Sequence, residues 1–160
     1  MSKLGKRTDQ RMAMLKNQVS ELLWYGQIET TVDRAKAVRS LAEKYITIAM
    51  RAYQDDVKVT KTVDGAKGAK QEVVFTNDGP KKLAARRRLM AELVDLQEIK
   101  GEKESKSAFK ARIKDTKHPL IEKMFKEYAP KYDARKNELG QGGGYTRILK
   151  TGTRRGDAAE

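Results

Sequence analysis

The sequence predicts an α+β fold, and three observations support that prediction. Apolar residues recur at helical spacing in several long segments. Short segments rich in β-branched residues at 27–31 and 145–150 indicate strands. The segment 55–78 alternates around a glycine-containing turn. We therefore expect one domain over residues 1–160, with 55–78 as an inserted β-hairpin and 95–117 as a charged insertion or loop.

The amino-terminal third predicts two helices joined by a short strand. The first helix is expected from Thr8, as N-cap, to about Tyr25, with Gly26 ending it. Its inward stripe is Met12, Leu15, Val19, Leu22 and Leu23. A strand at 27–31 is expected to lead into a second helix that Thr30 caps. The inward residues of that helix are Ala35, Val38, Leu41, Ala42, Tyr45 and Ala49.

The hairpin segment differs from the rest of the chain in charge as well as in pattern. Residues 52–80 hold four Lys and five acidic residues, a net charge of −1. Valines and one phenylalanine alternate on both sides of the turn, at Val57, Val59, Val63, Val73 and Phe75. We expect the tip of this segment to meet solvent or protein and not to bind phosphate strongly.

The carboxy-terminal half predicts two further helices separated by a charged segment. Pro80 is suited to the first turn of a helix that runs to about Leu96. Opposite charges alternate over 98–117, which indicates a loop or a frayed helix. Pro119 is expected to open a last helix, with His118 as its entry residue, and Pro130 to stop or kink it. Its packing residues are Leu120, Ile121, Met124, Phe125 and Tyr128.

The charge balance points to a polyanionic partner. Lys and Arg number 35 against 22 Asp and Glu, which gives a net charge of +13. A soluble domain this basic repels itself unless RNA or DNA neutralises it, and an anionic membrane surface is the rival partner. The positive charge lies in the two ends of the chain and in the segment 81–139.

The composition gives little support for catalysis, metal binding or a membrane span. The chain has no cysteine and one histidine, so thiolate chemistry and a histidine-rich metal site are excluded. We see no pair of carboxylates in an apolar setting that would act as acid and base. No apolar run is long enough to cross a membrane and no apolar signal core begins the chain, so we expect a cytoplasmic protein. We expect no cofactor, no small-molecule substrate and no enzymatic activity.

The carboxy-terminal tail combines glycines, an aromatic residue and cations. Residues 140–145 place tyrosine where a dinucleotide-binding loop needs glycine or alanine, and no Gly-Lys-Ser/Thr follows. Two interpretations of Tyr145 stay open: its ring stacks on a base, or it packs at a core or edge position.

In the run Arg86–Arg88, the three guanidinium groups spread through about 200° of a helix, so one of them must face away from any single partner.

Several short motifs, in order along the chain, resemble those of bacterial large-subunit ribosomal protein seventeen. The match covers nearly the whole chain apart from 55–78 and about 95–117. The motifs are Leu4-Gly5-Lys6, residues 9–17, Ile28-Glu29-Thr30-Thr31, Ala35-Lys36 with Arg39, Ala42-Glu43-Lys44 with Ile46-Thr47, Gly143 to Lys150, and Arg154 to Ala158.

The resemblance implies an α+β domain, with helices packed on a small mixed β-sheet and basic termini. It implies a structural constituent of the large ribosomal subunit that binds ribosomal RNA beside the nascent-chain tunnel exit, contacts neighbouring ribosomal proteins and supports assembly. The RNA-binding residues it implies are Lys3, Lys6, Arg11, Lys16, Lys36, Arg39, Tyr145, Thr146, Arg147, Lys150, Arg154 and Arg155. Charge alone adds Arg7, Arg86, Arg87 and Arg88.

A free-standing nucleic-acid-binding regulator is the alternative function, because the same cations would serve it. Such a protein usually presents a compact recognition helix with base-reading side chains at its start. We find no turn between two helices that suits this motif, so the ribosomal interpretation is preferred.

Overall fold

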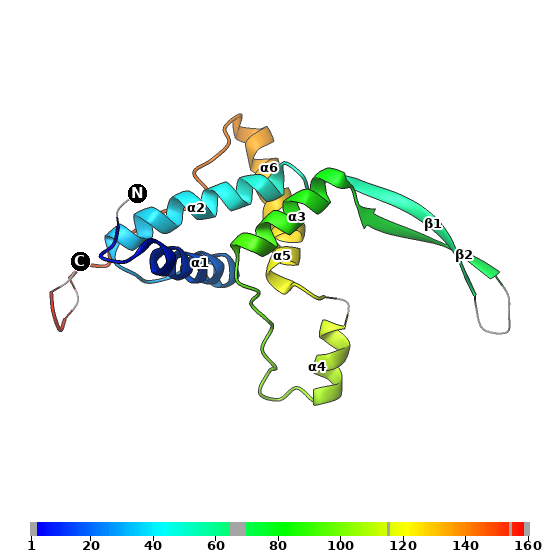
Figure 1. Ribbon diagram of the computed structural model, residues 1–160, viewed down its shortest axis with the longest axis horizontal. Coiled ribbons are helices and arrows are strands. Elements are labelled where there is room, and N and C mark those ends of the chain that lie inside the picture. The colour runs from blue at the N-terminus through cyan, green and yellow to red at the C-terminus, as the bar shows by residue number, and fades with distance from the viewer. Residues whose placement is uncertain (1–2, 65–69, 115, 154, 159–160) are drawn as a thin grey trace.

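The chain folds into a helical body from which a β-hairpin projects (Figure 1). The computed structural model describes residues 3–64, 70–114, 116–153 and 155–158, with the side chains of 64, 70 and 71 left aside. The elements are α1 (Thr8–Tyr25), α2 (Val32–Met50), β1 (Asp56–Asp64), β2 (Lys70–Asp78), α3 (Pro80–Glu92), α4 (Lys106–Ile113), α5 (Pro119–Lys123), the π-helix η1 (Met124–Tyr128) and α6 (Ala129–Leu139).

The α+β class is confirmed, but the sheet is not a mixed sheet beneath the helices. Within the described residues, the sheet consists of β1 and β2, which are antiparallel. The helices pack on one another instead, with α2 against α1, α3, η1 and α6. The core is therefore helical, and the hairpin lies outside it.

The predicted strands at 27–31 and 145–150 do not form among the described residues. Both segments are irregular, because neither has a neighbouring strand to pair with its backbone N–H and C=O groups. Thr31, not Thr30, is the N-cap of α2. Thr30 instead accepts a hydrogen bond from Gln18 Nε2 at 3.1 Å.

The first helix follows the predicted bounds closely. Gly26 ends it with a positive φ of 83°, and its N–H donates to the Leu22 carbonyl. Leu15, Val19 and Leu23 are buried, whereas Met12 is 36% exposed and was wrongly placed in the stripe. Arg7 is the N-cap, not Thr8, and its side chain makes no capping hydrogen bond.

A buried serine fixes where α3 ends. Ser20 is fully buried, and its Oγ donates to the Lys16 carbonyl and accepts from the Val94 N–H at 2.9 Å. Leu93 takes an extended conformation, so the helix ends at Glu92, four residues before the predicted Leu96. The charged segment that follows α3 is part loop and part helix, since α4 occupies Lys106–Ile113. Ser105 is the N-cap of α4, and its side chain accepts a hydrogen bond from Ala108 N.

Pro130 does not stop the last helix. His118 is the N-cap of α5, as predicted, and the helix then widens into η1 before continuing as α6. In η1, Ala129 N donates to Met124 O, five residues back. Because proline lacks an N–H, a wider turn next to it accommodates the missing α-helical hydrogen bond. Leu120, Ile121, Met124 and Phe125 are buried as predicted.

Both described ends of the chain lie at one end of the molecule, and the hairpin projects from the opposite end (Figure 1). Within the described residues, no helix is both long and apolar enough to cross a membrane. The described side chains also form no cluster of three or more metal-ligating residues.

Candidate nucleic-acid interface

The amino-terminal arm, residues 3–7, is a turn that exposes three cations. Lys6 N donates to the Lys3 carbonyl at 3.1 Å, and Gly5 has a positive φ of 64°. Leu4 packs against the core and anchors the turn. Lys3, Lys6 and Arg7 are exposed, and the Arg7 pair with Asp9 at 3.6 Å is so open to water that it contributes little. The turn therefore leaves its three cations exposed.

Two predicted contacts on α1 are turned toward the protein. Lys16 Nζ donates to the Ala91 carbonyl at 2.5 Å, near the end of α3, where backbone carbonyls lack helical partners. Arg11 is half-buried, and its Nε is buried without a hydrogen-bond partner among the described atoms. In the isolated chain Lys16 thus stabilises the fold, which the sequence did not predict.

Glu43 connects α2 to the carboxy-terminal tail. Its Oε1 accepts from Arg39 Nε at 3.2 Å and from Thr146 Oγ1 at 2.9 Å. Burial favours the neutral carboxyl, but these two donors outweigh it and hold the pKa of Glu43 below its usual value. Thr146 is therefore bound to protein, and Lys36, one helical turn before Arg39, stays exposed.

Tyr145 is an anchor for the tail. Its ring lies 4.6 Å from the ring of Tyr132 on α6, and its hydroxyl contacts Met50 Sδ at 3.6 Å. The ring is half-buried against the core, so the packing interpretation weighed above is the one that the free chain adopts. Beyond this anchor, Arg147, Lys150 and Arg155 are exposed, and Arg154 lies outside the described residues.

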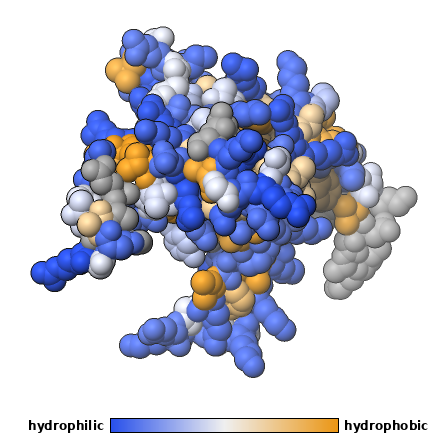
Figure 2. Space-filling view, turned by 60° about the vertical axis from the view of Figure 1, so that its left-hand side comes forward, coloured by the Kyte–Doolittle hydropathy of each residue, from blue (hydrophilic) through white to orange (hydrophobic). Residues whose placement is uncertain are grey.

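A groove brings five of the predicted residues together. Its cavity volume is about 930 Å³, between the end of α1, the segment 26–32, α2, η1, α6 and the tail. The predicted contacts that line it are Arg39, Tyr145, Thr146, Arg147 and Lys150. Lys131 lines it too and was missed, although it stands next to Tyr132, whose ring centroid is 5.9 Å from its Nζ. With the terminal end turned forward, the visible face is mostly hydrophilic, with small separate apolar patches (Figure 2).

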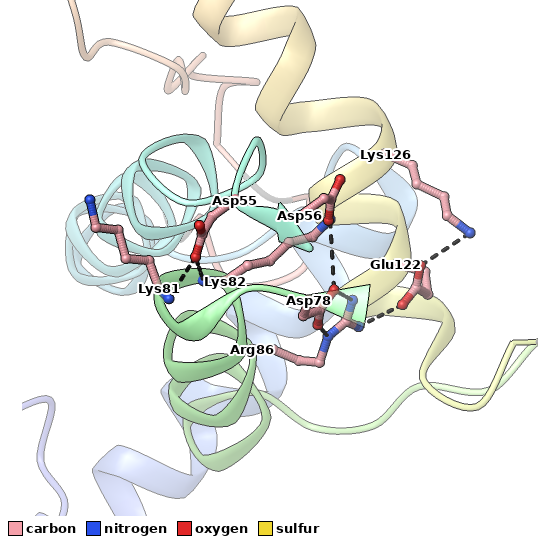
Figure 3. Close-up of polar contacts among 8 residues, drawn as sticks. All are labelled: Asp55, Asp56, Asp78, Lys81, Lys82, Arg86, Glu122 and Lys126. Atoms are coloured by element: carbon pink, nitrogen blue, oxygen red, sulfur yellow. Dashed lines mark hydrogen bonds and ion pairs between the residues drawn. The ribbon is translucent and has the colours of Figure 1, made fainter. Parts of the chain in front are cut away.

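Arg86 has an internal role at the base of the hairpin. It donates to Asp78 Oδ2 and to Glu122 Oε1, each at 2.5 Å, and joins β2, α3 and α5 (Figure 3). The Arg86 hydrogen bond lowers the pKa of Asp78. Burial disfavours the charged guanidinium, but its two carboxylate partners outweigh burial and raise the pKa of Arg86. Arg87 and Arg88 are exposed, whereas Arg86 binds carboxylates of the protein. This agrees with the prediction that the three guanidinium groups cannot all face one partner.

The exposed cations that were predicted on the amino-terminal arm, on α2 and in the tail form a surface that we call the terminal basic surface. It comes from three segments far apart in sequence, which meet at the end of the molecule where the chain begins and ends (Figure 1). Its residues are Lys3, Lys6, Arg7, Lys36, Arg39, Arg147, Lys150 and Arg155. Cations presented in this way can contact successive phosphates of a nucleic acid.

Comparison with known proteins agrees with the resemblance. The family model described as "Ribosomal protein L17" matches residues 14–160. A large ribosomal subunit protein bL17 of Lachnospira eligens is 37% identical over 177 residues, covering 98% of this chain and 93% of the relative. The bL17 proteins of Clostridium acetobutylicum and Clostridium tetani are each 37% identical over 158 residues, covering 99% of this chain and 89% of each relative. The chain therefore belongs to the bacterial ribosomal protein L17 family, whose members are structural, non-catalytic components of the large subunit of the cytoplasmic ribosome.

Proposed function

We propose that this protein binds ribosomal RNA of the large subunit through the terminal basic surface, beside the nascent-chain tunnel exit, and supports assembly of the subunit. The observation that carries the proposal is the meeting of exposed cations from the amino-terminal arm, α2 and the tail at one end of the molecule. Membership of a ribosomal protein family supplies the particle in which that RNA is found.

The fold explains how three separate segments would present their cations together. Leu4 anchors the arm, the helix holds Lys36, and Tyr145 with Thr146 fastens the start of the tail to α6 and α2. Anchoring restricts the segments before RNA arrives, which reduces the conformational entropy that binding must remove. Arg87 and Arg88, on α3, would contact RNA elsewhere on the protein.

Binding of this kind has a recognisable dependence on salt. Each phosphate that a cation neutralises releases condensed counterions, so affinity falls as salt rises. With about six to ten contacts, affinity is expected to fall by roughly 10³ to 10⁵ between about 50 and 200 mM salt.

Sucrose-gradient fractionation of a lysate tests the assignment to the particle. We expect the chain to sediment with large subunits, and ultraviolet irradiation of the purified subunits to cross-link Arg147 or Arg155 peptides to ribosomal RNA. A chain found wholly outside large-subunit particles would remove the proposal and promote the free-standing regulator. Accumulation of incomplete subunits on depletion is the expected sign of an assembly role.

Proximity to the tunnel exit has its own test. The chain lacks cysteine, so a single Thr153→Cys variant can carry a photoreactive label. On stalled ribosomes, we expect this label to cross-link nascent chains just long enough to leave the tunnel. A label that cross-links ribosomal RNA but never a nascent chain of any length contradicts the tunnel-exit position and leaves RNA binding intact.

A further inference from the structure

The hairpin arm, residues 56–78, presents an apolar face outside the core. The strands pair antiparallel with Val59 opposite Phe75 and Lys61 opposite Val73. Residues opposite each other point to the same side, and alternate residues point to opposite sides. One face of the ribbon therefore carries Val57, Val59, Val63, Val73 and Phe75.

This apolar face is uncovered in the isolated protein. Val57, Val63, Val73 and Phe75 are 44%, 42%, 39% and 40% exposed. On the other face, Lys58, Thr60, Thr62 and Thr76 are polar, with Val74 the apolar exception. Apolar side chains clustered on one side of a projecting ribbon are typical of a surface that another molecule covers.

The charge of the arm argues that this molecule is a protein. Residues 52–80 have a net charge of −1 in a chain of net charge +13. Among the described residues of the apolar face, the cation is Lys61. Its Nζ lies 5.8 Å from the centroid of the Phe75 ring. A phosphate backbone requires several cations, which this face does not offer, whereas an apolar protein surface gains from burying valine and phenylalanine.

The base of the arm fixes its direction relative to the body. Lys82 Nζ binds Asp56 Oδ1 at 2.7 Å, and Arg86 binds Asp78 (Figure 3). Asp55 Oδ2 accepts from Lys81 N at 2.7 Å, at the start of α3. A Cβ on Gly79 would lie 2.5 Å from this carboxylate, so the close turn requires glycine. An arm held this firmly loses little freedom when it docks.

We infer that the apolar face of the hairpin arm docks on an apolar, weakly charged surface of another protein in the same ribosomal particle. The inference rests on the proposed function for its setting. It gives the inserted segment a role separate from RNA binding, because the arm and the terminal basic surface lie at opposite ends of the molecule (Figure 1).

Site-specific photo-cross-linking tests the inference in intact large subunits. p-Benzoylphenylalanine is placed at Phe75, on the apolar face, or at Val74, on the other face, as a matched control. We expect a protein adduct several-fold stronger from position 75 than from position 74, identified by mass spectrometry as another large-subunit protein. An adduct to ribosomal RNA only, to a second copy of this chain, or to nothing overturns the inference.

A charge placed on either face gives a second test. In chains labelled at Phe75, Val63→Glu adds a carboxylate to the apolar face and Thr62→Glu adds one to the other face of the same strand. We expect loss of the protein adduct with Val63→Glu and its retention with Thr62→Glu. Equal adducts in both variants contradict docking through this face. Absence of the labelled chain without either glutamate from large subunits would count against the proposed function and not against the arm, whereas loss of the Val63→Glu chain alone would support docking through this face.

Discussion

The two ends of the molecule use the same residue types for opposite purposes. At the hairpin end, Lys82 and Arg86 are only 13% and 19% exposed in their side chains and bind Asp56, Asp78 and Glu122. At the terminal end, the cations of the arm, α2 and tail stay exposed, including Arg39, whose side chain is 51% exposed although it pairs with Glu43. Net charge alone would treat both groups alike. Burial among carboxylates, and not the cation itself, therefore decides whether a cation serves the fold or stays available to a partner.

Arg86→Ala is expected to have the largest effect on stability. It removes the donor shared by two partly buried carboxylates and should lower the free energy of unfolding by about 2–3 kcal/mol, somewhat below the cost of breaking a fully buried pair. Chemical denaturation measures this. Arg87→Ala, on the same helix and exposed, is the control and should stay within about 0.5 kcal/mol of the wild type. An equal loss of unfolding free energy in the two variants would contradict the internal role of Arg86.

Tyr145→Ala should have the next largest effect and tests the anchor of the tail. Losing the ring against Tyr132 should cost about 2 kcal/mol in the free energy of unfolding of the isolated protein. Tyr145→Phe keeps the ring and loses only a weak contact to sulfur, so it should change stability by less than about 0.5 kcal/mol. If Tyr145→Ala leaves the unfolding midpoint unchanged, the ring does not hold the tail in the free protein.

Gly79→Ala should destabilise the hairpin base by about 1 kcal/mol, because the Asp55 carboxylate must move from the start of α3 and give up its capping hydrogen bonds. The φ of Gly79 is −70°, which alanine tolerates, so the cost is steric. Gly156→Ala, with no atom near its added Cβ, is the control. Thermal unfolding compares the two, and a Gly79→Ala melting temperature equal to that of the control disproves the steric account.

Acid should weaken the ion pairs at the hairpin end, and this effect on stability is expected to be the smallest of the four. The pKa of Asp78 is lowered by Arg86, and that of Glu122 is lowered because its hydrogen bonds outweigh burial. A lowered folded-state pKa stabilises the fold above the unfolded value and loses that contribution as pH falls through the folded value. The ordinary values are 3.8 and 4.5, so the loss should begin below about pH 4.5. Urea unfolding at several pH values should show a steeper decline for the wild type than for Arg86→Ala. Parallel declines contradict this linkage.

Local signals in the sequence predicted most of the element bounds. Gly26, Pro80 and Pro119 act through their own backbone geometry, and each marks a helix boundary in the structure. Alternation predicted two antiparallel strands, which β1 and β2 confirm, and the predicted glycine turn lies outside the described residues. The strand predicted at 27–31 does not form among the described residues, because a strand needs a second segment to pair with.

The candidate site was less predictable than the fold, because residues far away in sequence determine whether a cation binds the protein or stays exposed. Lys16 meets Ala91, 75 residues later, and Arg86 meets Glu122, 36 residues later. The helical angle between Arg86, Arg87 and Arg88 indicated that one must differ, but not which. By contrast, the exposed cations of the arm were predicted because few apolar neighbours surround them in sequence.

The salt dependence of binding to purified large-subunit ribosomal RNA shows whether the protein binds this RNA through the terminal basic surface. The triple variant Lys36→Ala, Arg147→Ala, Arg155→Ala removes three cations of the terminal basic surface, and Lys103→Ala, Lys106→Ala, Lys110→Ala removes three exposed cations near α4. We expect the first to flatten the slope of log affinity against log salt by roughly 2–3. The second should leave the slope within about 1 of the wild type. Equal slopes for the two variants would contradict binding through the terminal end.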